Sequence, residues 1–195
     1  MVEKVDYSRY LESPEEFSRQ SQWWSGPENH QLCEEIAQWI PPGSVVCDAG
    51  AGSGEAIPIW YRHASKVIAV DACELAVSHI HSSYPFVDVY CADLRNLNAY
   101  ALSVDVVICK AVLKHFGPEW RDILRQLCGV ARSRVIFTMG VDEVSVDRNP
   151  DVPYYDWAEP LSEIFFAIPS PWRIVKQFGN PLEPVFVCDR KRFEK

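Results

Sequence analysis

The feature that most limits the fold of this chain is an apolar run that leads directly into three closely spaced glycines. Residues 45–54 read Val-Val-Cys-Asp-Ala-Gly-Ala-Gly-Ser-Gly, with glycines at 50, 52 and 54. A short apolar run rich in β-branched residues predicts a buried strand, and the glycines allow a tight turn that brings bare backbone against a ligand. Dinucleotide-binding turns have the spacing G-x-G-x-x-G, whereas this chain has G-x-G-x-G. The sequence therefore predicts a strand followed by a ligand-binding loop of a different kind.

Three later apolar runs end in or lead into charged residues that are expected near this loop. Residues 66–71 end in Asp71, and residues 87–94 form a run with Asp93 near its end. In a doubly wound sheet, an acidic side chain at the end of the second strand can accept hydrogen bonds from both ribose hydroxyls. A fourth run at 104–109 continues into Lys110-Ala-Val-Leu-Lys-His-Phe116. Since ligands bind beyond the carboxyl ends of such strands, these segments are expected around one crevice.

Together the four segments resemble the cofactor-binding motifs of class I S-adenosylmethionine (SAM)-dependent methyltransferases, over residues 44 to about 140. The resemblance implies that Asp48 and the glycines serve the methionine end of SAM, and that Asp71 binds the ribose. It also implies that Asp93 with Leu94 binds adenine, and that the backbone of residues 109–111 lies near the sulfonium. SAM is then the expected cofactor and S-adenosylhomocysteine the expected product. The cofactor-binding residues expected on this basis are Asp48, Gly50, Ala51, Gly52, Gly54, Asp71, Ala72, Asp93, Leu94, Cys109 and Lys110.

The order of the apolar runs predicts an α/β fold. Strands are expected at 44–49, 66–71, 87–92, 104–109 and 134–138, and helices at 25–40, near 54–63, and at 73–84, 120–130 and 158–167. Such alternation predicts right-handed crossovers and a parallel sheet. Two last runs, at 173–178 and 184–189, are separated by a short link that predicts a hairpin. We therefore expect a doubly wound, mainly parallel seven-stranded sheet with a terminal antiparallel hairpin and helices on both faces.

The helix expected at 25–40 has a start signal of its own. Ser25-Gly-Pro-Glu28 has the S-x-x-E form of a capping box. In the helix near 54–63, Pro58 is tolerable only in a first turn.

The length of 195 residues suits a single domain over residues 1–195. We expect an N-terminal cap or lid at 1–40, the cofactor-binding core at 44–140, a substrate-side insert at 141–172 and the C-terminal hairpin at 173–195. Similar methyltransferases fold the first and third of these segments over the cleft. The aromatic residues expected to form the lid are Trp23, Trp24, Tyr154, Tyr155 and Trp157. An alternative is that such aromatics only pack the two segments onto the sheet.

His115 and Lys110 are the candidate catalytic residues. Methyl transfer depends largely on proximity and alignment, so an acceptor that is already nucleophilic needs no dedicated base. Where the acceptor is a hydroxyl or a carboxylic acid, a histidine at the position of His115 can take the proton. A histidine that only caps or packs at a helix start has the same sequence signature. Lys110 stands directly after the fourth predicted strand.

The resemblance implies a methyltransferase, and we expect a small-molecule acceptor methylated at O, N or C. One alternative is methylation of a protein or nucleic-acid group with the help of a partner chain, and a homodimer also fits this scheme. Another is a SAM-binding module without catalysis, used for regulation or assembly. A dehydrogenase needs the longer glycine spacing and a separate substrate domain, which the chain lacks.

The composition and the apolar runs also disfavour nucleic acid, membranes and metal ions as partners. A net charge of −8 disfavours nucleic acid, because such binding depends on Lys and Arg against phosphates. No apolar run reaches membrane-spanning length and no signal-peptide pattern opens the chain, so we expect a cytoplasmic protein and no membrane partner. The seven cysteines include no C-x-x-C pair, so no metal site is expected.

Overall fold

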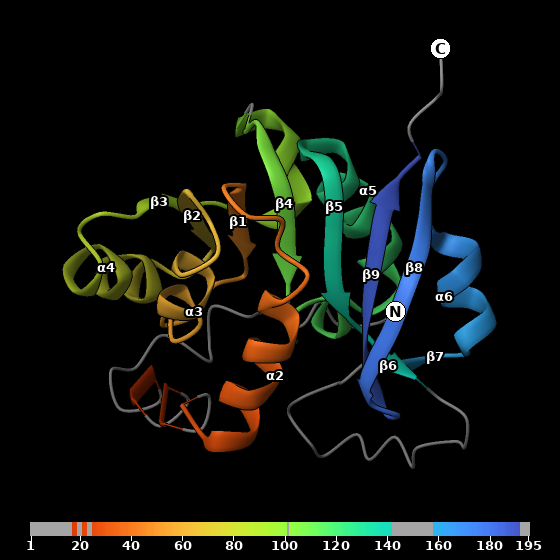
Figure 1. The fold of residues 1–195 in the computed structure, drawn as a ribbon, viewed down its shortest axis with the longest axis horizontal. Helices are drawn as coiled ribbons and strands as arrows, with labels where there is room; N and C mark the ends of the chain where they lie inside the picture. The colour runs from red at the N-terminus through yellow and green to blue at the C-terminus, as the bar shows by residue number, and fades with distance from the viewer. Residues whose placement is uncertain (1–16, 19–20, 23–24, 101, 142–157, 192–195) are drawn as a thin grey trace.

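A seven-stranded sheet with the strand order β3-β2-β1-β4-β5-β9-β8 forms the centre of the molecule (Figure 1). The computed structural model describes residues 17–18, 21–22, 25–100, 102–141 and 158–191. The strands are β1 (Val45–Ala49), β2 (Lys66–Asp71), β3 (Asp88–Cys91), β4 (Val104–Cys109), β5 (Ala131–Thr138), β8 (Trp172–Asn180) and β9 (Glu183–Arg190). The five strands from β1 to β5 pair in parallel, and β9 pairs antiparallel with both β5 and β8. The predicted mainly parallel sheet and its terminal hairpin are confirmed.

Helices cover both faces of this sheet. They are α2 (Pro27–Ala37), α3 (Ile57–Tyr61), α4 (Glu74–Ser83), α5 (Trp120–Val130) and α6 (Leu161–Ala167), with the 3₁₀ segments η2 (Leu94–Tyr100) and η3 (Leu113–Glu119). In the described part of the chain, no helix is long and apolar enough to cross a bilayer.

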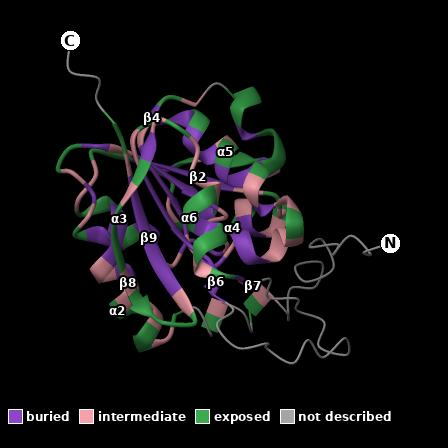
Figure 2. Cartoon of the chain, turned by 90° about the vertical axis from the view of Figure 1, so that its right-hand side faces the viewer, coloured by how far each residue is buried: buried purple, intermediate pink, exposed green. Residues whose placement is uncertain are grey.

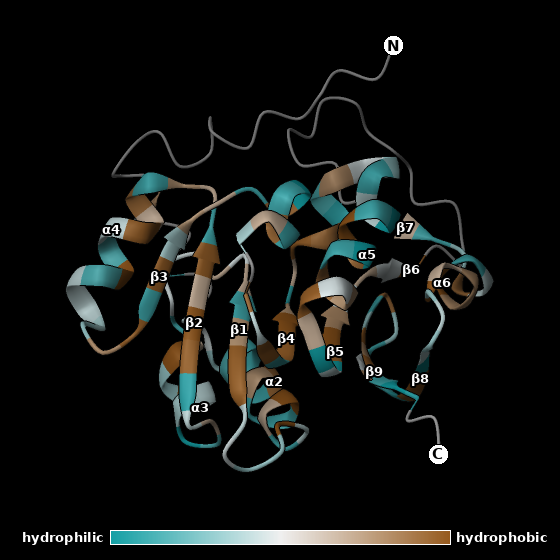
Figure 3. Cartoon of the chain, turned by 90° about the horizontal axis from the view of Figure 1, so that it is seen from above, coloured by the Kyte–Doolittle hydropathy of each residue, from teal (hydrophilic) through white to brown (hydrophobic). Residues whose placement is uncertain are grey.

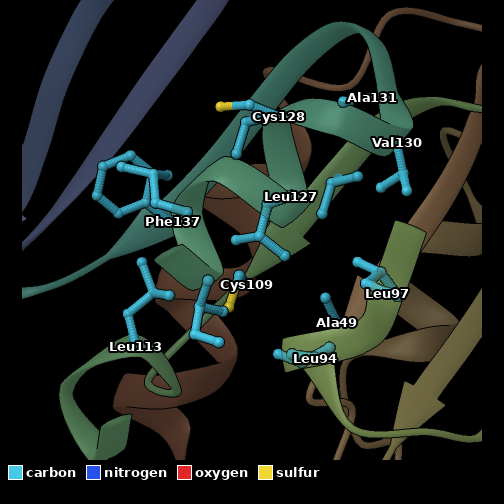
Figure 4. Packing of buried hydrophobic residues seen from close by; sticks show 14 of the residues in the cluster. Ala49, Leu94, Leu97, Cys109, Leu113, Leu127, Cys128, Val130, Ala131 and Phe137 are labelled. Atoms are coloured by element: carbon cyan, nitrogen blue, oxygen red, sulfur yellow. The ribbon is translucent and has the colours of Figure 1, made fainter. Parts of the chain in front are cut away.

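Two hydrophobic cores follow from the alternation of side chains along the central strands. In β1, Val46 belongs to the core shared with α2, α3 and α4, whereas Cys47 belongs to the core shared with η2, η3, α5 and α6. Successive side chains of a strand point to opposite faces, so a strand buried on both sides must be apolar at nearly every position. Figure 2 shows these strands as the buried interior, Figure 3 shows their hydrophobic colouring, and Figure 4 shows the packing of the second core around Leu127 and Phe137.

Two helix starts differ from the sequence prediction. The predicted capping box at Ser25 is wrong, because the N-cap of α2 is Gly26 and no side chain caps it. Pro27 takes the first helical position, which its fixed φ favours, and this moves the N-cap one residue past Ser25. The Ser25 hydroxyl instead donates to the Ser21 carbonyl at 2.7 Å. α3 is shorter than predicted, and Pro58 lies in its first turn as required.

A second, two-stranded sheet follows β5 and was not predicted. Its strands β6 (Gly140–Val141) and β7 (Ala158–Glu159) are parallel and contain only two residues each. The predicted helix at 158–167 accordingly begins only at Leu161, with Pro160 as its N-cap. The Val141 amide also donates to the Leu182 carbonyl in the β8–β9 turn at 2.9 Å. This places the β8–β9 turn beside the end of β5, at the edge of the sheet where the parallel strands end.

Candidate functional site

The loop between β1 and α3 leaves its middle backbone open. Gly50, Gly52 and Gly54 all have positive φ, at 82°, 55° and 83°. A Cβ on Gly50 would lie 2.4 Å from the Val112 Cγ2 atom, and one on Gly54 would lie 2.9 Å from the Ile57 Cδ1 atom, so both are needed for close packing. A Cβ on Gly52 would meet nothing within 4 Å. The loop is thus fixed at both ends and exposes bare backbone at Gly52.

Asp71 lies at the end of β2, directly against this loop. Its Oδ2 atom accepts from the Gly52 amide at 2.8 Å, and its Oδ1 atom accepts from the Cys73 amide at 2.9 Å. Burial raises the pKa of Asp71, while these backbone hydrogen bonds act in the opposite direction. A carboxylate has about four acceptor positions, so Asp71 can accept further hydrogen bonds from a ligand. Ala72, the next residue, is exposed.

Asp48 is a buried carboxyl group in β1, only 5% exposed. Its Oδ2 atom accepts from the Trp60 indole N–H of α3 at 2.8 Å. Burial raises the pKa of Asp48 to about 6, although the Trp60 hydrogen bond and the charge of Lys110 lower it. The side chain therefore changes its charge close to neutral pH, next to the glycine loop.

Lys110 connects the end of β4 with α2. Its Nζ atom donates to the Asn29 Oδ1 atom at 2.7 Å. Burial raises the pKa of Cys33 in α2 to about 11, and the charge of Lys110 opposes this rise, as it does at Asp48. The structure therefore places the Lys110 ammonium toward α2 and Asp48. Cys109, just before it, is fully buried.

Asp93 lies two residues past the end of β3 and is bound by Arg95. Asp93 accepts from the Arg95 amide at 2.8 Å and from the Arg95 Nη1 atom at 2.9 Å. Arg95 also donates to Glu119 at 2.8 Å, and its guanidinium lies 5.0 Å from the centroid of the Phe116 ring. Next to Asp93, Leu94 is buried. Sequence reasoning missed Arg95, although an arginine two residues after a strand-end aspartate was a usable signal.

His115 lies in η3, which follows β4 at the carboxyl edge of the sheet. Its side chain is half-buried, and its amide donates to the Val112 carbonyl at 3.0 Å. Ala111 precedes this segment with a φ of 57°.

Thr138, Glu183 and Lys114 form a hydrogen-bonded group that reaches Ala111 through Thr138, and none of the three was predicted as a site residue. The Ala111 amide donates to the Thr138 Oγ1 atom at 2.7 Å. The available signal for Thr138 was its position at the end of an apolar strand. The available signal for Lys114 was a lysine in an apolar stretch. Glu183 carried no signal, because its role depends on how the hairpin docks.

The five aromatic residues predicted as the lid fall outside the described residues: Trp23, Trp24, Tyr154, Tyr155 and Trp157. Within the described ranges, no group of three or more His, Cys, Asp or Glu side chains is arranged to hold a metal ion.

Comparison with known proteins adds a family to this geometry. A family model described as "Methyltransferase domain" matches residues 47–139. A probable S-adenosylmethionine-dependent methyltransferase of Mycobacterium tuberculosis is 36% identical over 109 residues, which are 55% of this chain and 39% of that protein. The match thus spans about two fifths of the length of that relative.

Two solved structures share the fold over nearly the whole chain. The magnesium protoporphyrin IX methyltransferase of Synechocystis, solved with bound SAM, superposes with a TM-score of 0.79 at 17% identity and covers 98% of both chains. The 1,6-didemethyltoxoflavin-N1-methyltransferase of Burkholderia thailandensis, solved with 1,6-didemethyltoxoflavin and S-adenosylhomocysteine, has a TM-score of 0.70 at 16% identity. The superposition covers 98% of this chain and 92% of the Burkholderia chain. At such identities the likeness establishes the fold alone.

Proposed function

Because the chain belongs to the class I SAM-dependent methyltransferases, we propose that it transfers the methyl group of SAM to a small-molecule acceptor. The family and the cofactor predicted from the four sequence motifs are confirmed. The observation that carries the proposal is the open backbone at Gly52 beside the Asp71 carboxylate.

The residues of the described site fit the chemistry of SAM. The ribose hydroxyls need an acceptor, which Asp71 provides at the end of β2. The bare backbone at Gly52 gives the ligand close access, because no side chain fills that space. The amino-acid end of SAM carries an ammonium group, and an ionised Asp48 near the same loop offers a compensating negative charge. We assign adenine to the segment of Asp93 and Leu94, where the Arg95 guanidinium lies over the ring of Phe116.

The acceptor side is assigned to the ends of β4 and β5. When bound, SAM would supply a methyl group on a positively charged sulfur, and this sulfur leaves when a nucleophile attacks the methyl carbon. The chain then has to hold the nucleophile in line and exclude water, which accounts for much of the rate in such reactions. His115 follows β4 at this edge, and we assign it the proton of an acceptor that carries a hydroxyl or a carboxylic acid. Lys110 acts indirectly in this scheme. Its ammonium group stabilises the ionised form of Asp48 and fixes the start of the loop after β4.

Two observations support a small molecule as the acceptor. The two relatives above are named for small-molecule substrates, magnesium protoporphyrin IX and 1,6-didemethyltoxoflavin. The net charge of −8 disfavours nucleic acid. We also propose that residues 44–140 hold the cofactor and that residues 141–172 contribute to the acceptor side, in one domain.

Calorimetric titration of SAM and S-adenosylhomocysteine tests the cofactor site. We expect micromolar binding to the wild-type protein and a loss of at least tenfold in Asp71→Asn, which corresponds to about 1.4 kcal/mol. Asp88→Asn is the matched control, since Asp88 lies at the start of the neighbouring strand and pairs with Lys66. Failure of the wild-type protein to bind either ligand would refute the proposal, and equal binding by Asp71→Asn would refute the role of Asp71.

A screen for S-adenosylhomocysteine release then tests the reaction. The acceptors should include small phenols, amines and carboxylic acids, with a peptide library as the competing class. Turnover with a small molecule is the expected result, and His115→Gln should lower kcat only for acceptors that lose a proton. Turnover with peptides alone would replace the acceptor class. Cofactor binding with no turnover on any acceptor would favour a regulatory module.

A further inference from the structure

Ala111 has a backbone conformation that needs an explanation. Among the described residues, it is the one non-glycine residue with positive φ, at 57°. A side chain in this left-handed region is uncommon and persists only where the surrounding structure holds it. Ala111 is buried and lies just after β4, at the edge of the sheet where the glycine loop also lies. Backbone strain of this kind tends to gather at functional sites.

A chain of polar groups holds the Ala111 peptide. The Ala111 amide donates to the Thr138 hydroxyl oxygen at 2.7 Å, and the Thr138 hydroxyl donates to the Glu183 Oε1 atom at 3.0 Å. The Lys114 ammonium donates to the Glu183 Oε2 atom at 2.8 Å. The single hydroxyl proton of Thr138 points to Glu183, so its oxygen lone pairs are left to accept from Ala111. We call Thr138, Glu183 and Lys114 the anchor network.

The anchor network joins three segments that are far apart in the sequence. Thr138 ends β5, Glu183 begins β9 and Lys114 lies in η3. In Figure 1 the arrowheads of β4 and β5 and the start of β9 lie at the same edge of the sheet. Thr138 is 2% and Lys114 is 8% exposed. Burying an ammonium group is costly, and apolar residues of similar volume often stabilise a fold as well, so stability alone does not account for this arrangement.

The next residue connects Ala111 to the cofactor loop. The Val112 side chain packs directly on Gly50, because a Cβ on Gly50 would lie 2.4 Å from Val112 Cγ2. A change of φ at Ala111 would move Val112 and alter this contact. The conformation of the Ala111 peptide therefore sets how the loop after β4 meets the loop after β1.

We propose that the anchor network is a positioning device, which holds Ala111 in its left-handed conformation and thereby fixes Val112 against the cofactor loop. The proposal rests on the proposed function, since it concerns the same cofactor site. Thr138, Glu183 and Lys114 are positioning residues in this scheme and act on the cofactor only through Ala111 and Val112.

A double-mutant cycle with Thr138→Val and Ala111→Gly tests this proposal by calorimetric titration of S-adenosylhomocysteine. Thr138→Val keeps the shape but removes the acceptor for the Ala111 amide, so we expect about tenfold weaker binding, or about 1.4 kcal/mol. Thr138→Ser keeps the hydroxyl and should bind like the wild-type protein. Glycine adopts positive φ without strain, so Ala111→Gly should restore most of the affinity lost by Thr138→Val. Ser133→Ala, which removes a hydroxyl at the opposite end of β5, should leave affinity unchanged.

The outcomes separate positioning from simple structural support. A Thr138→Val variant that binds normally would overturn the proposal, and so would a loss of affinity that persists unchanged in the Ala111→Gly background. If Thr138→Val does not fold, Glu183→Gln takes its place, because the Glu183 side chain is only half-buried at the start of β9. The weaker binding expected of Glu183→Gln should again be rescued by Ala111→Gly. Wild-type protein that binds no S-adenosylhomocysteine would refute the proposed function instead. Hydrogen exchange of the Ala111 amide would then test the positioning role. Exchange should be faster in Thr138→Val than in the wild-type protein, and equal exchange in the two proteins would overturn the proposal.

Discussion

Replacing Asp48 by Asn should make the protein more stable at alkaline pH and no more stable in acid. Burial raises the pKa of Asp48 from 3.8 to about 6. At about 1.4 kcal/mol per pKa unit, this difference is worth about 3 kcal/mol. The asparagine side chain keeps an oxygen that can accept from the Trp60 indole, so the substitution removes the charge and retains the hydrogen bond.

The sign of the effect follows from proton binding in the two states. In the unfolded chain Asp48 loses its proton near pH 4, whereas in the folded protein it keeps the proton until about pH 6. The free energy of unfolding therefore falls as the pH rises from 4 to 6 and remains lower above that range. An asparagine side chain does not titrate, so the advantage of the Asp48→Asn variant should grow from near zero at pH 4 to about 3 kcal/mol at pH 8.

Urea unfolding at pH 4, 6 and 8, followed by tryptophan fluorescence, measures this difference. Asp122→Asn is the control, because the Asp122 side chain is 75% exposed on α5 and should show no such pH-dependent gain. Parallel stability curves for Asp48→Asn and the wild-type protein across this pH range would refute the burial argument. The same variant should bind SAM more weakly at pH 8, since the site loses a negative charge.

Two further predictions concern the cofactor loop and the C-terminal hairpin. Gly50→Ala should unfold more readily and bind no SAM, because its methyl group would overlap a neighbouring side chain. Gly52→Ala should stay folded and bind SAM more weakly. Thermal melts measure the stability of the two variants, and calorimetry measures their binding of SAM. Equal melting temperatures for the two variants would contradict this. Arg134→Met should cost about 2 kcal/mol in urea unfolding, since the half-buried arginine bonds Asp189 at 2.6 and 2.9 Å. The exposed Arg132→Met is its control and should cost less than about 1 kcal/mol, and similar losses in both variants would argue against the Arg134 pair.

The sheet was predictable because its signals are local. Each central strand is buried on both faces and reads as an apolar run, and the glycines after β1 reveal a turn that other residues cannot make. The link at residues 179–181 marked the terminal hairpin in the same way. The strands β6 and β7 were missed because two residues carry no periodic pattern. The capping box failed because one proline, Pro27, decided where the helix begins.

The placement of the candidate site residues was predictable only where a residue lies at the end of a strand. Asp71 and Gly52 were expected at one crevice, and the structure joins them by a hydrogen bond. The pKa of Asp48 was out of reach, because burial raises it while the hydrogen bond from an indole twelve positions along the chain opposes the rise. The bond between Lys114 and Glu183 joins residues 69 positions apart, and only the docking of β9 brings them together.

The docking of β9 has a consequence for recombination between related proteins. The family match ends at residue 139, so Glu183 lies outside the module that the match defines, although it bonds two residues inside it. A chimera that exchanges the C-terminal hairpin must therefore carry compatible partners for Thr138 and Lys114. The hairpin and the loop after β4 should therefore be exchanged together in such a chimera.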